Sequence, residues 1–273
     1  MAARDYPVAR PVWMEEDSDF LGGPFQVMEC VAGDTLLNLL LKDHFALWWA
    51  LPQMADVHAR LHQMPLEELT VPARPFLDRQ MEDLQAAVDD YGLRGLAPGV
   101  AWLRRRRSPP APPCMVHMDY HPGNILMRDG RRAAVLDWSE ADIGDRHADL
   151  GKALFTIDAG PVEDPSPWER LVLPVGRWLT HHGYLHAYRR RLPVDPERLR
   201  YYQALAALQR LTWYGRWLAA GPRVMGFKPG AEDRVRPGHV AEVERYFERH
   251  SGVSIRLDVP LRAAASRPML TAH

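Results

Sequence analysis

The sequence predicts an α+β fold, in which a short two-stranded segment precedes a larger and mostly helical region. Three observations predict it. The start of the chain alternates apolar stretches with a turn-rich insert, apolar residues recur at helical intervals over most of the remainder, and one small hairpin interrupts the helices near the middle. With 273 residues, the chain is long enough to bury a substantial core.

The N-terminal segment is expected to form two strands, at residues 8–14 and 25–31. The insert between them, residues 15–24, contains glycines and a proline that favour a connecting loop. Asp34 then offers a helix N-cap, and the leucine-rich run 36–41 begins the first helix. The chain therefore changes from sheet to helix at this point.

Helices are expected next at residues 44–64, 74–90 and 99–107. In the first of these, apolar residues fall mostly three and four positions apart, which indicates a buried helix that Pro52 can kink. A proline-rich break at residues 109–113 then stops regular structure. A functional segment follows this break.

Beyond that segment, two short strands are expected at residues 124–127 and 133–136, joined by a turn at 128–130. Their pairing forms the small hairpin. Helical periodicity then continues to about residue 250, and proline and glycine break it at three places, residues 161–167, 193–196 and 221–230.

Composition excludes several classes of function. The net charge is −1, which predicts no nucleic-acid partner, and no apolar run is long enough to span a bilayer. No secretory signal follows Met1, so we expect a cytoplasmic protein without a membrane role. Cys30 and Cys114 are far apart in sequence and predict neither a disulfide framework nor a zinc site. The sequence predicts no particular oligomeric state.

The segment HMDYHPGN, residues 117–124, and the aspartate at 137 carry the chemical signal. In-line phosphoryl transfer needs a carboxylate to accept a proton from the attacking hydroxyl and oxygen ligands to hold Mg²⁺. Asp119, on a loop, can face the hydroxyl. Asn124 and Asp137 lie at the base of the predicted hairpin, so we expect both to reach one metal ion.

A metal-dependent hydrolase is the alternative that the same residues leave open. His117, Asp119 and His121 alternate, and on a strand they would share one face and could ligate zinc or iron. Pro122 and Gly123 follow directly and favour a loop instead. For His117 we expect a buried structural hydrogen bond.

Residues 116–126 resemble the catalytic loop of the aminoglycoside phosphotransferase family, which includes choline-kinase-like enzymes and shares the protein-kinase fold. Residues 135–138 are similar to its metal-binding segment, and residues 144–150 to its G-D-x-x-x-D-L stretch. Residues 24–33 resemble its hinge between lobes. The likeness runs from about residue 8 to about residue 220.

The resemblance implies transfer of the ATP γ-phosphoryl group to a hydroxyl of a small-molecule acceptor, with ATP and Mg²⁺ as cofactors. Asp119 is then the catalytic base, and Asn124 and Asp137 hold the metal. The resemblance also assigns two supporting groups. Asp149 braces the catalytic loop, and the adenine lies against the hinge residues Met28, Glu29 and Val31.

One part of the family pattern has no counterpart in this sequence. The family places a phosphate-covering loop, a strand lysine and a helical glutamate before the hinge, whereas Lys42, Lys152 and Lys228 all follow it. We therefore expect a truncated chain from a misplaced start or a degraded gene. The expected fold is protein-kinase-like, with a mostly helical C-lobe (34–250), a two-stranded N-lobe remnant with the hinge (1–33), and a tail (251–273).

Two hypotheses remain for what such a chain does. One is a small-molecule kinase, and the other is a catalytically weak or inactive nucleotide-binding pseudokinase. For the acceptor, Trp213 and Trp217 on a helix could line a pocket or pack in the core. Glu140 and Asp142 could meet a cationic substrate or be solvated loop acids.

Overall fold

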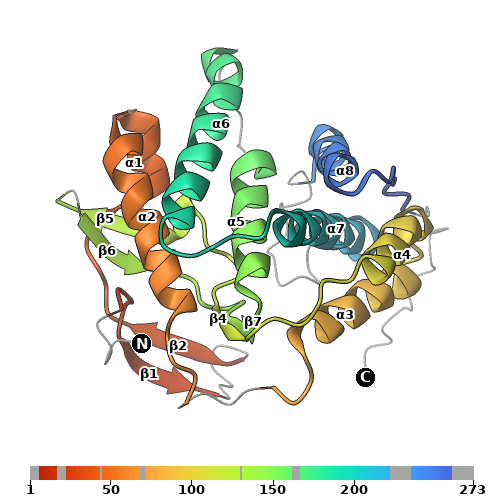
Figure 1. Ribbon diagram of the computed structural model, residues 1–273, viewed down its shortest axis with the longest axis horizontal. Helices are drawn as coiled ribbons and strands as arrows, with labels where there is room; N and C mark the ends of the chain where they lie inside the picture. Colours follow the sequence, from red (N-terminus) through yellow and green to blue (C-terminus); the bar gives the residue numbers. More distant parts are fainter. Residues whose placement is uncertain are drawn as a thin grey trace, which may run out of the picture. The chain divides into compact units, whose positions relative to one another are not determined.

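The computed structural model describes residues 6–16, 23–43, 45–67, 72–129, 131–161, 167–221 and 235–259 (Figure 1). The strands are β1 Pro11–Glu15, β2 Phe25–Met28, β3 Asp34–Thr35, β4 Cys114–Val116, β5 Ile125–Arg128, β6 Arg131–Val135 and β7 Asp142–Gly144. The helices are α1 Leu36–Lys42, α2 Ala46–His62, α3 Phe76–Asp90, α4 Ala97–Arg105, α5 Arg146–Ala159, α6 Pro167–Arg189, α7 Pro196–Ala220 and α8 Pro237–Ser251.

The predicted elements are present with small shifts at their ends, but the N-cap of α1 is Thr35 rather than Asp34, which lies in β3. β1 and β2 form an antiparallel pair with Trp13 opposite Val27, and β5 pairs with β6 in the expected hairpin. The predicted break at residues 193–196 lies between α6 and α7, whereas most of the residues in the predicted breaks at 161–167 and 221–230 lie outside the described residues. Three very short strands, β3, β4 and β7, were not predicted. They exist because β3 pairs with β5, and β4 pairs with β7, across long stretches of sequence.

The chain divides into two compact units. The first comprises residues 1–76 and 109–203, and the second comprises residues 77–108 and 204–273. Every described strand lies in the first unit, together with α1, α2, α5 and α6. The two-stranded sheet β1–β2 therefore shares a unit with the β5–β6 hairpin. Val8 forms a parallel bridge to Val135, and the Val135 N–H donates to the Pro7 carbonyl at 2.7 Å.

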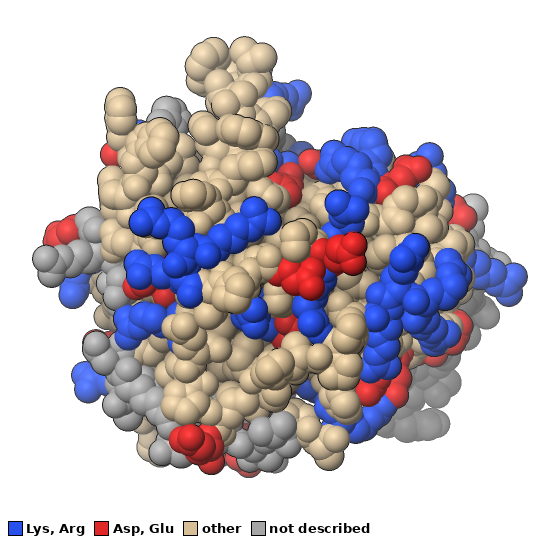
Figure 2. All heavy atoms as spheres, viewed as in Figure 1, with Lys and Arg blue, Asp and Glu red and all other residues tan. Residues whose placement is uncertain are grey.

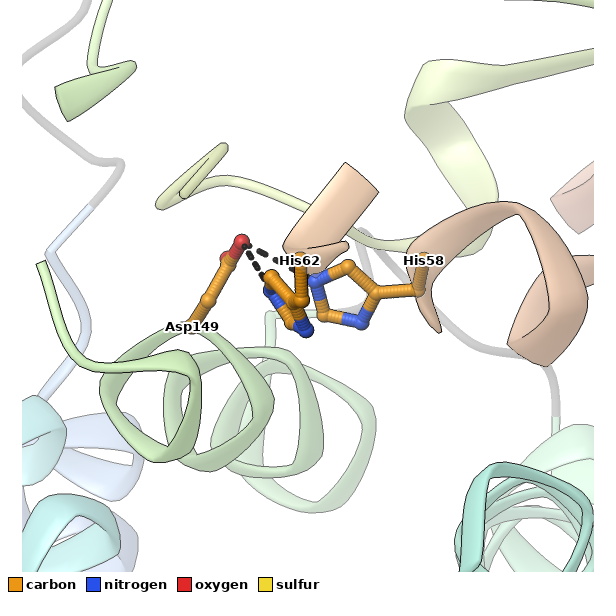
Figure 3. A group of neighbouring side chains, drawn as sticks. All are labelled: His58, His62 and Asp149. Atoms are coloured by element: carbon orange, nitrogen blue, oxygen red, sulfur yellow. Dashed lines mark hydrogen bonds and ion pairs between the residues drawn. The ribbon is translucent and has the colours of Figure 1, made fainter. Parts of the chain in front are cut away.

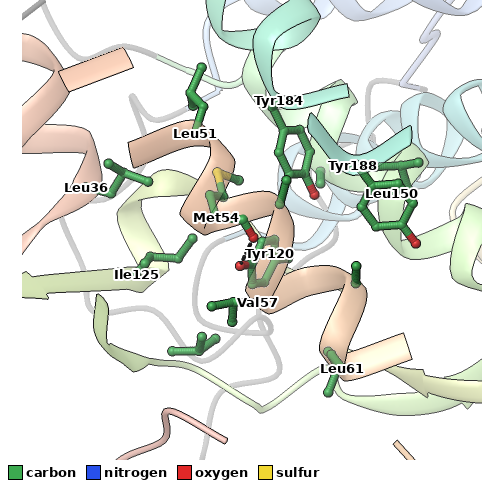
Figure 4. Packing of buried hydrophobic residues seen from close by; sticks show 14 of the residues in the cluster. Leu36, Leu51, Met54, Val57, Leu61, Tyr120, Ile125, Leu150, Tyr184 and Tyr188 are labelled. Atoms are coloured by element: carbon green, nitrogen blue, oxygen red, sulfur yellow. Dashed lines mark hydrogen bonds between the residues drawn. The ribbon is translucent and has the colours of Figure 1, made fainter. Parts of the chain in front are cut away.

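Helix α2 is the centre of the first unit (Figure 4). Leu51, Met54 and Leu61 are almost fully buried in its apolar face, as the three- and four-residue spacing predicts. α2 packs along α6, which contributes Tyr184 and Tyr188 to the same core. Burial of an aliphatic side chain of this size contributes about 1.5–3 kcal/mol to folding. This core is the support on which the catalytic loop rests.

The second unit is a helical core of its own. Gly99 of α4 packs against Leu208, Phe247 and Ile255, each within 3.4 Å of the position that a Cβ would take. A larger residue at 99 would force these neighbours apart, so the glycine is required by close packing. Among the described residues, none of the helices is both long enough and apolar enough to cross a lipid bilayer.

Candidate active site

The predicted catalytic loop leaves β4 in an unusual backbone conformation. Met118 has φ 62°, a left-handed conformation that non-glycine residues rarely adopt. Two hydrogen bonds hold it there, because Asp149 accepts from the backbone N–H of His117 at 2.6 Å and from that of Met118 at 2.9 Å. Such backbone strain persists only where surrounding contacts enforce it, and it is common at functional sites.

Asp119 and Asn124 are joined directly. The Asn124 Nδ2 donates to the Asp119 carbonyl oxygen at 3.0 Å and to Asp119 Oδ2 at 2.9 Å. This fixes the orientation of the Asn124 amide, because both of its contacts to Asp119 use the donor end and leave Oδ1 as the acceptor end. The loop therefore presents a carboxylate and an amide oxygen side by side.

Asp137 is brought to the same place by the hairpin. The Leu136 N–H donates to the Asn124 carbonyl at 2.8 Å, so the backbone of Asn124 is paired with the residue that precedes Asp137. Asp137 is exposed, has φ 56°, and its Oδ1 accepts from the Ser139 hydroxyl at 2.6 Å. Asp137 therefore directly follows a residue that is paired with Asn124, and Asn124 is in turn bonded to Asp119.

His117 links the loop to the hairpin. Its Nε2 donates to the Leu136 carbonyl at 2.9 Å, and its Nδ1 accepts from the Asp119 N–H at 3.2 Å. Burial lowers the pKa of His117, although neighbouring carboxylates act in the opposite direction. A neutral ring with hydrogen on Nε2 satisfies both contacts. The geometry matches the structural hydrogen bond that we expected for this residue.

Two basic groups act on the Asp119 carboxylate. Burial alone would raise its pKa, but a hydrogen bond and the charge of His121, followed by the charge of Lys152, lower it below the usual value. His121 Nε2 lies 3.6 Å from Asp119 Oδ2, and Lys152 also forms an ion pair with Glu140. Asp119 is therefore ionised at neutral pH and able to accept a proton.

A buried cluster lies beneath the loop (Figure 3). Asp149, on α5, is fully buried, and its Oδ2 accepts from His62 Nε2 at 3.1 Å. His58 Nε2 lies 2.9 Å from the same oxygen. Burial opposes the charge on Asp149, but the two histidines and their hydrogen bonds bring its pKa well below the usual value. The carboxylate that holds the loop is thus itself held by α2.

Tyrosines complete this cluster from α6. Tyr188 OH lies 2.6 Å from His62 Nδ1, and Tyr184 OH is hydrogen-bonded to His58 Nδ1. Burial raises the pKa of both tyrosines, so both hydroxyls keep their hydrogens. Because Asp149 can only accept, the histidines carry hydrogen on Nε2, and the hydroxyls donate to Nδ1. We call His58, His62, Asp149, Tyr184 and Tyr188 the buried brace.

Tyr120 ties the loop to the buried brace. Its ring stacks on His58 with centroids 4.0 Å apart, and its hydroxyl donates to the Met54 carbonyl at 2.7 Å (Figure 4). Tyr120 directly follows Asp119. The position of the proposed base is therefore set by the packing of α2 as well as by hydrogen bonds.

His58, His62 and Asp149 also have the ligand types and the spacing of a metal site, with all ligand atoms within 4.8 Å of one another. Their contacts favour a hydrogen-bond network instead. Asp149 Oδ2 already accepts from the His117 N–H at 2.6 Å and from His62 Nε2 at 3.1 Å, while His58 Nε2 lies 2.9 Å away as an ion-pair contact. We assign the cluster a structural role.

The metal-hydrolase alternative receives no support from this geometry. His117 is buried and uses both ring nitrogens within the protein, and the segment is a loop rather than a strand. The group of His, Cys, Asp and Glu that could hold a metal within the described residues is the one beneath the loop, without His117, Asp119 or His121. The alternation in sequence does not place these three side chains on one face.

The predicted adenine-binding residues lie on β2 and just after it. In the hinge segment, Glu29 forms an ion pair with Arg10 at 3.2 Å, and its N–H donates to the Arg10 carbonyl at 2.9 Å. Met28 is half-exposed on β2, and Val31 is partly buried. Of the acidic residues beyond Asp137, Asp142 begins β7 and accepts from the Ile143 N–H at 2.7 Å.

The two predicted tryptophans lie in the second unit. Trp217 is 2% exposed, and its ring centroid lies 4.9 Å from that of Trp213. The Arg210 guanidinium lies 5.8 Å from the Trp213 ring, within the range of a cation–π contact. Lys228 lies outside the described residues.

Sequence reasoning did not assign roles to His58, His62, Tyr184 and Tyr188. A signal was present, because each pair is spaced four residues apart on a helix and so shares one face. The spacing alone does not reveal that these two faces meet, or that a carboxylate lies between the histidines.

The site geometry agrees with a comparison to known families. The model of the phosphotransferase enzyme family, APH, matches residues 1–202, and the chain belongs to this family. The matched region includes the catalytic loop, the hairpin and Asp149. No curated protein matches the chain by sequence.

Solved structures show the same fold at low identity. A putative aminoglycoside phosphotransferase from Ralstonia eutropha has 18% identity and a TM-score of 0.64, with 92% of this chain and 79% of that chain covered. A choline/ethanolamine kinase family protein from Mesorhizobium loti has 15% identity and a TM-score of 0.59, covering 92% and 80%. A mutant aminoglycoside phosphotransferase in ternary complex with AMP-PNP and hygromycin B has 19% identity and a TM-score of 0.61, covering 90% and 76%. The fold is the protein-kinase-like α+β fold of these proteins.

Proposed function

We propose that the protein transfers the γ-phosphoryl group of ATP to a hydroxyl of a small molecule. One observation carries the proposal. Asp119 is bonded to Asn124, whose backbone pairs with the strand that leads to Asp137, so a base and two oxygen ligands lie on one supported loop and hairpin. Such a reaction needs positioning and charge stabilisation more than covalent chemistry from the protein.

In this proposal Asp119 orients the acceptor hydroxyl and accepts its proton. The lowered pKa of Asp119 keeps the carboxylate ionised at neutral pH, which the role requires. Its exposed fraction is 26%, so an acceptor can reach it. Asn124 holds the Asp119 carboxylate in one orientation through the 2.9 Å hydrogen bond, and this lowers the cost of reaching the reactive geometry.

Asn124 and Asp137 fit a magnesium ion by the chemistry of their atoms. The Asn124 Oδ1 and the exposed Asp137 carboxylate are hard oxygen donors, one just before β5 and the other just after β6, which suits Mg²⁺. When bound, Mg²⁺ supplies charge neutralisation at the phosphates. The hinge backbone at Glu29 and Val31, with Met28 beside it, is proposed to receive the adenine.

A second candidate is a nucleotide-binding protein without turnover. It is favoured by one observation, that the lysine nearest in effect to the proposed base already has an acidic partner. Lys152 is the lysine whose charge acts on Asp119, and it is already paired with Glu140. In the kinase proposal this group supplies part of the positive charge at the site. The protein then acts in the cytoplasm, where ATP is present.

An assay of ATP consumption distinguishes the two candidates. The wild-type chain is incubated with ATP, Mg²⁺ and a panel of hydroxyl compounds that includes hygromycin B, other aminoglycosides and choline. A kinase should show acceptor-dependent ADP release that falls by about 10²–10⁴-fold in Asp119→Asn. Asp129→Asn, an exposed carboxylate change in the hairpin turn, serves as the matched control and should retain full activity.

The outcomes are exclusive. Nucleotide binding without ADP release, equal in wild type and Asp119→Asn, supports the binding protein and overturns the kinase. If an acceptor gives activity, truncating Glu140, Asp142, Trp213 and Trp217 one at a time tests whether each residue contacts that substrate. Loss of a substrate contact should raise KM for that acceptor.

A further inference from the structure

Helix α6 carries an apolar stripe that faces solvent. Four large side chains of this stripe are more than half exposed, with exposed fractions of 68% for Trp168, 69% for Leu171, 60% for Val175 and 58% for Trp178. A contiguous apolar patch of several hundred Å² on a soluble protein is often an interaction site. Figure 2 shows the N-terminal end of α6 in tan, with a basic group only at one side.

The spacing of the stripe is that of a coiled-coil seam. Trp168, Leu171, Val175, Trp178 and His182 follow one another at intervals of three, four, three and four residues. His182 is also exposed, and its ring centroid lies 4.4 Å from that of Trp178. A seam of alternating three- and four-residue steps is the surface that packs against another helix.

The positions that flank the seam hold no Asp, Glu, Lys or Arg. In a heptad with Trp168 at its first position, the flanking residues are Val172, Pro174, Leu179 and His181. In coiled coils, charges at these positions set the choice and orientation of the partner, and like charges that meet there repel. Their absence here means that an identical copy meets no like-charge repulsion along the seam.

We propose that α6 forms the interface of a twofold symmetric dimer, in which the seam packs antiparallel against the same seam of a second copy. A twofold axis at Val175, the centre of the seam, pairs each Val175 with its counterpart. It also places Leu171 opposite Trp178 and Trp168 opposite His182. Large side chains thus face smaller ones, and two aromatic rings meet at each end.

The exposed apolar area of the seam suits packing against a second copy of the chain. An aromatic side chain presents about 150–250 Å², so the four large residues and the partly exposed Leu179 leave roughly 500 Å² of apolar surface in water. A stable interface buries about 800 Å² on each partner, with an apolar centre and a polar rim. The seam provides the centre of such an interface. This proposal is independent of the proposed activity.

Sedimentation velocity of the full chain over a wide concentration range tests the proposal. Wild type should sediment as a dimer, and Trp178→Arg should raise the dimer dissociation constant by about thirtyfold or more, because it places a charge within the apolar seam opposite Leu171. Leu218→Arg, at a similarly exposed leucine of α7, should leave the constant unchanged. A thermal melt monitored by circular dichroism checks that each variant is folded.

A cross-link tests the antiparallel register. In a Cys30→Ser background, which removes the exposed native thiol, Val175→Cys should give a covalent dimer on mild oxidation. Arg170→Cys, on the same helix but off the seam, should not. A monomer at every concentration overturns the proposal, even if it binds lipid vesicles or another protein. A dimer that is unaffected by Trp178→Arg and is not cross-linked through position 175 also overturns it.

Discussion

Asp149 and Asp119 are both carboxylates with a lowered pKa, but their surroundings differ in kind. Asp149 has no exposed side-chain surface and meets only donors from the protein, from α2 and from the loop backbone. Asp119 keeps 26% of its side chain exposed and is bonded on one side only, by Asn124 and the nearby His121. The buried Asp149 holds the backbone of the catalytic loop in place, and the partly exposed Asp119 can still contact a ligand.

The two aspartates are therefore expected to serve different ends, with Asp149 supporting the fold and Asp119 serving the proposed chemistry. Changes to the buried brace should alter folding first and activity as a consequence. Changes at the exposed site should alter activity while leaving folding intact. The predictions below test this separation, from the largest expected effect to the smallest.

Asp149→Ala should have the largest effect on stability. It leaves two buried histidines and the N–H groups of His117 and Met118 without their acceptor, and losing one partner of a buried charged network costs about 3–5 kcal/mol. Urea unfolding followed by tryptophan fluorescence measures the change. Asp90→Ala, at an exposed position of α3, should change stability by no more than about 0.5 kcal/mol. Equal effects of the two variants would show that the buried brace is not a support.

Acid should destabilise the fold before carboxylates titrate. Burial, followed by the charge of His58, lowers the pKa of His62 to about 4 in the folded protein, from an ordinary value of 6.5. Arg146 acts in the same direction, and Asp149 opposes it. His62 therefore becomes protonated below pH 6.5 in the unfolded chain, but only below about pH 4 in the folded chain. Stability from this group is complete above pH 6.5 and falls as the pH is lowered through that window.

The expected loss is roughly 3 kcal/mol between pH 6.5 and pH 4. Urea midpoints measured at several pH values give the slope. His62→Gln should be less stable at neutral pH, because the glutamine does not reproduce both contacts of the ring, and its stability should depend less steeply on pH in this window. A slope equal to that of wild type would assign the acid sensitivity to other groups.

Tyr188→Phe should have a moderate effect. It removes the hydroxyl that donates to His62 Nδ1 and leaves a buried acceptor unsatisfied, which costs about 1–3 kcal/mol. Differential scanning calorimetry measures the shift in Tm. Tyr91→Phe, at a partly exposed position at the end of α3, is the control and should shift Tm little. If Tyr188→Phe is as mild as the control, its hydroxyl is not part of the brace.

Lys152→Met should have the smallest effect, and it should appear at the exposed site. The positive charge of Lys152 helps to lower the pKa of Asp119, so its removal should raise that pKa and move the acid limb of the pH–activity profile to higher pH. Lys42→Met, which removes a lysine that is bonded to Asp34 instead, should leave the limb in place. Stability should change little in either variant. If the acid limb is unchanged in Lys152→Met, then Lys152 does not lower the pKa of the group that acts as the base.

The sequence predicted what depends on local chemistry. The proline-rich stretch at 193–196 lies at the predicted break between α6 and α7, and the predicted hairpin pairs Asn124 with the residue before Asp137. The short strands β3, β4 and β7 were missed because two or three residues carry no periodicity, and they form only by pairing with distant segments. The histidine and tyrosine pairs were missed because their partners lie 126 residues away in the chain.

Magnesium-dependent nucleotide binding tests the central claim most directly. Isothermal titration with AMP-PNP, with and without Mg²⁺, should show that the metal tightens binding to wild type and to Asp119→Asn. In Asp137→Asn this tightening should fall by about tenfold or more, while the thermal unfolding of the variant remains that of wild type. If Mg²⁺ tightens AMP-PNP binding to Asp137→Asn as much as to wild type, then Asn124 and Asp137 do not hold the metal and the proposed mechanism is wrong.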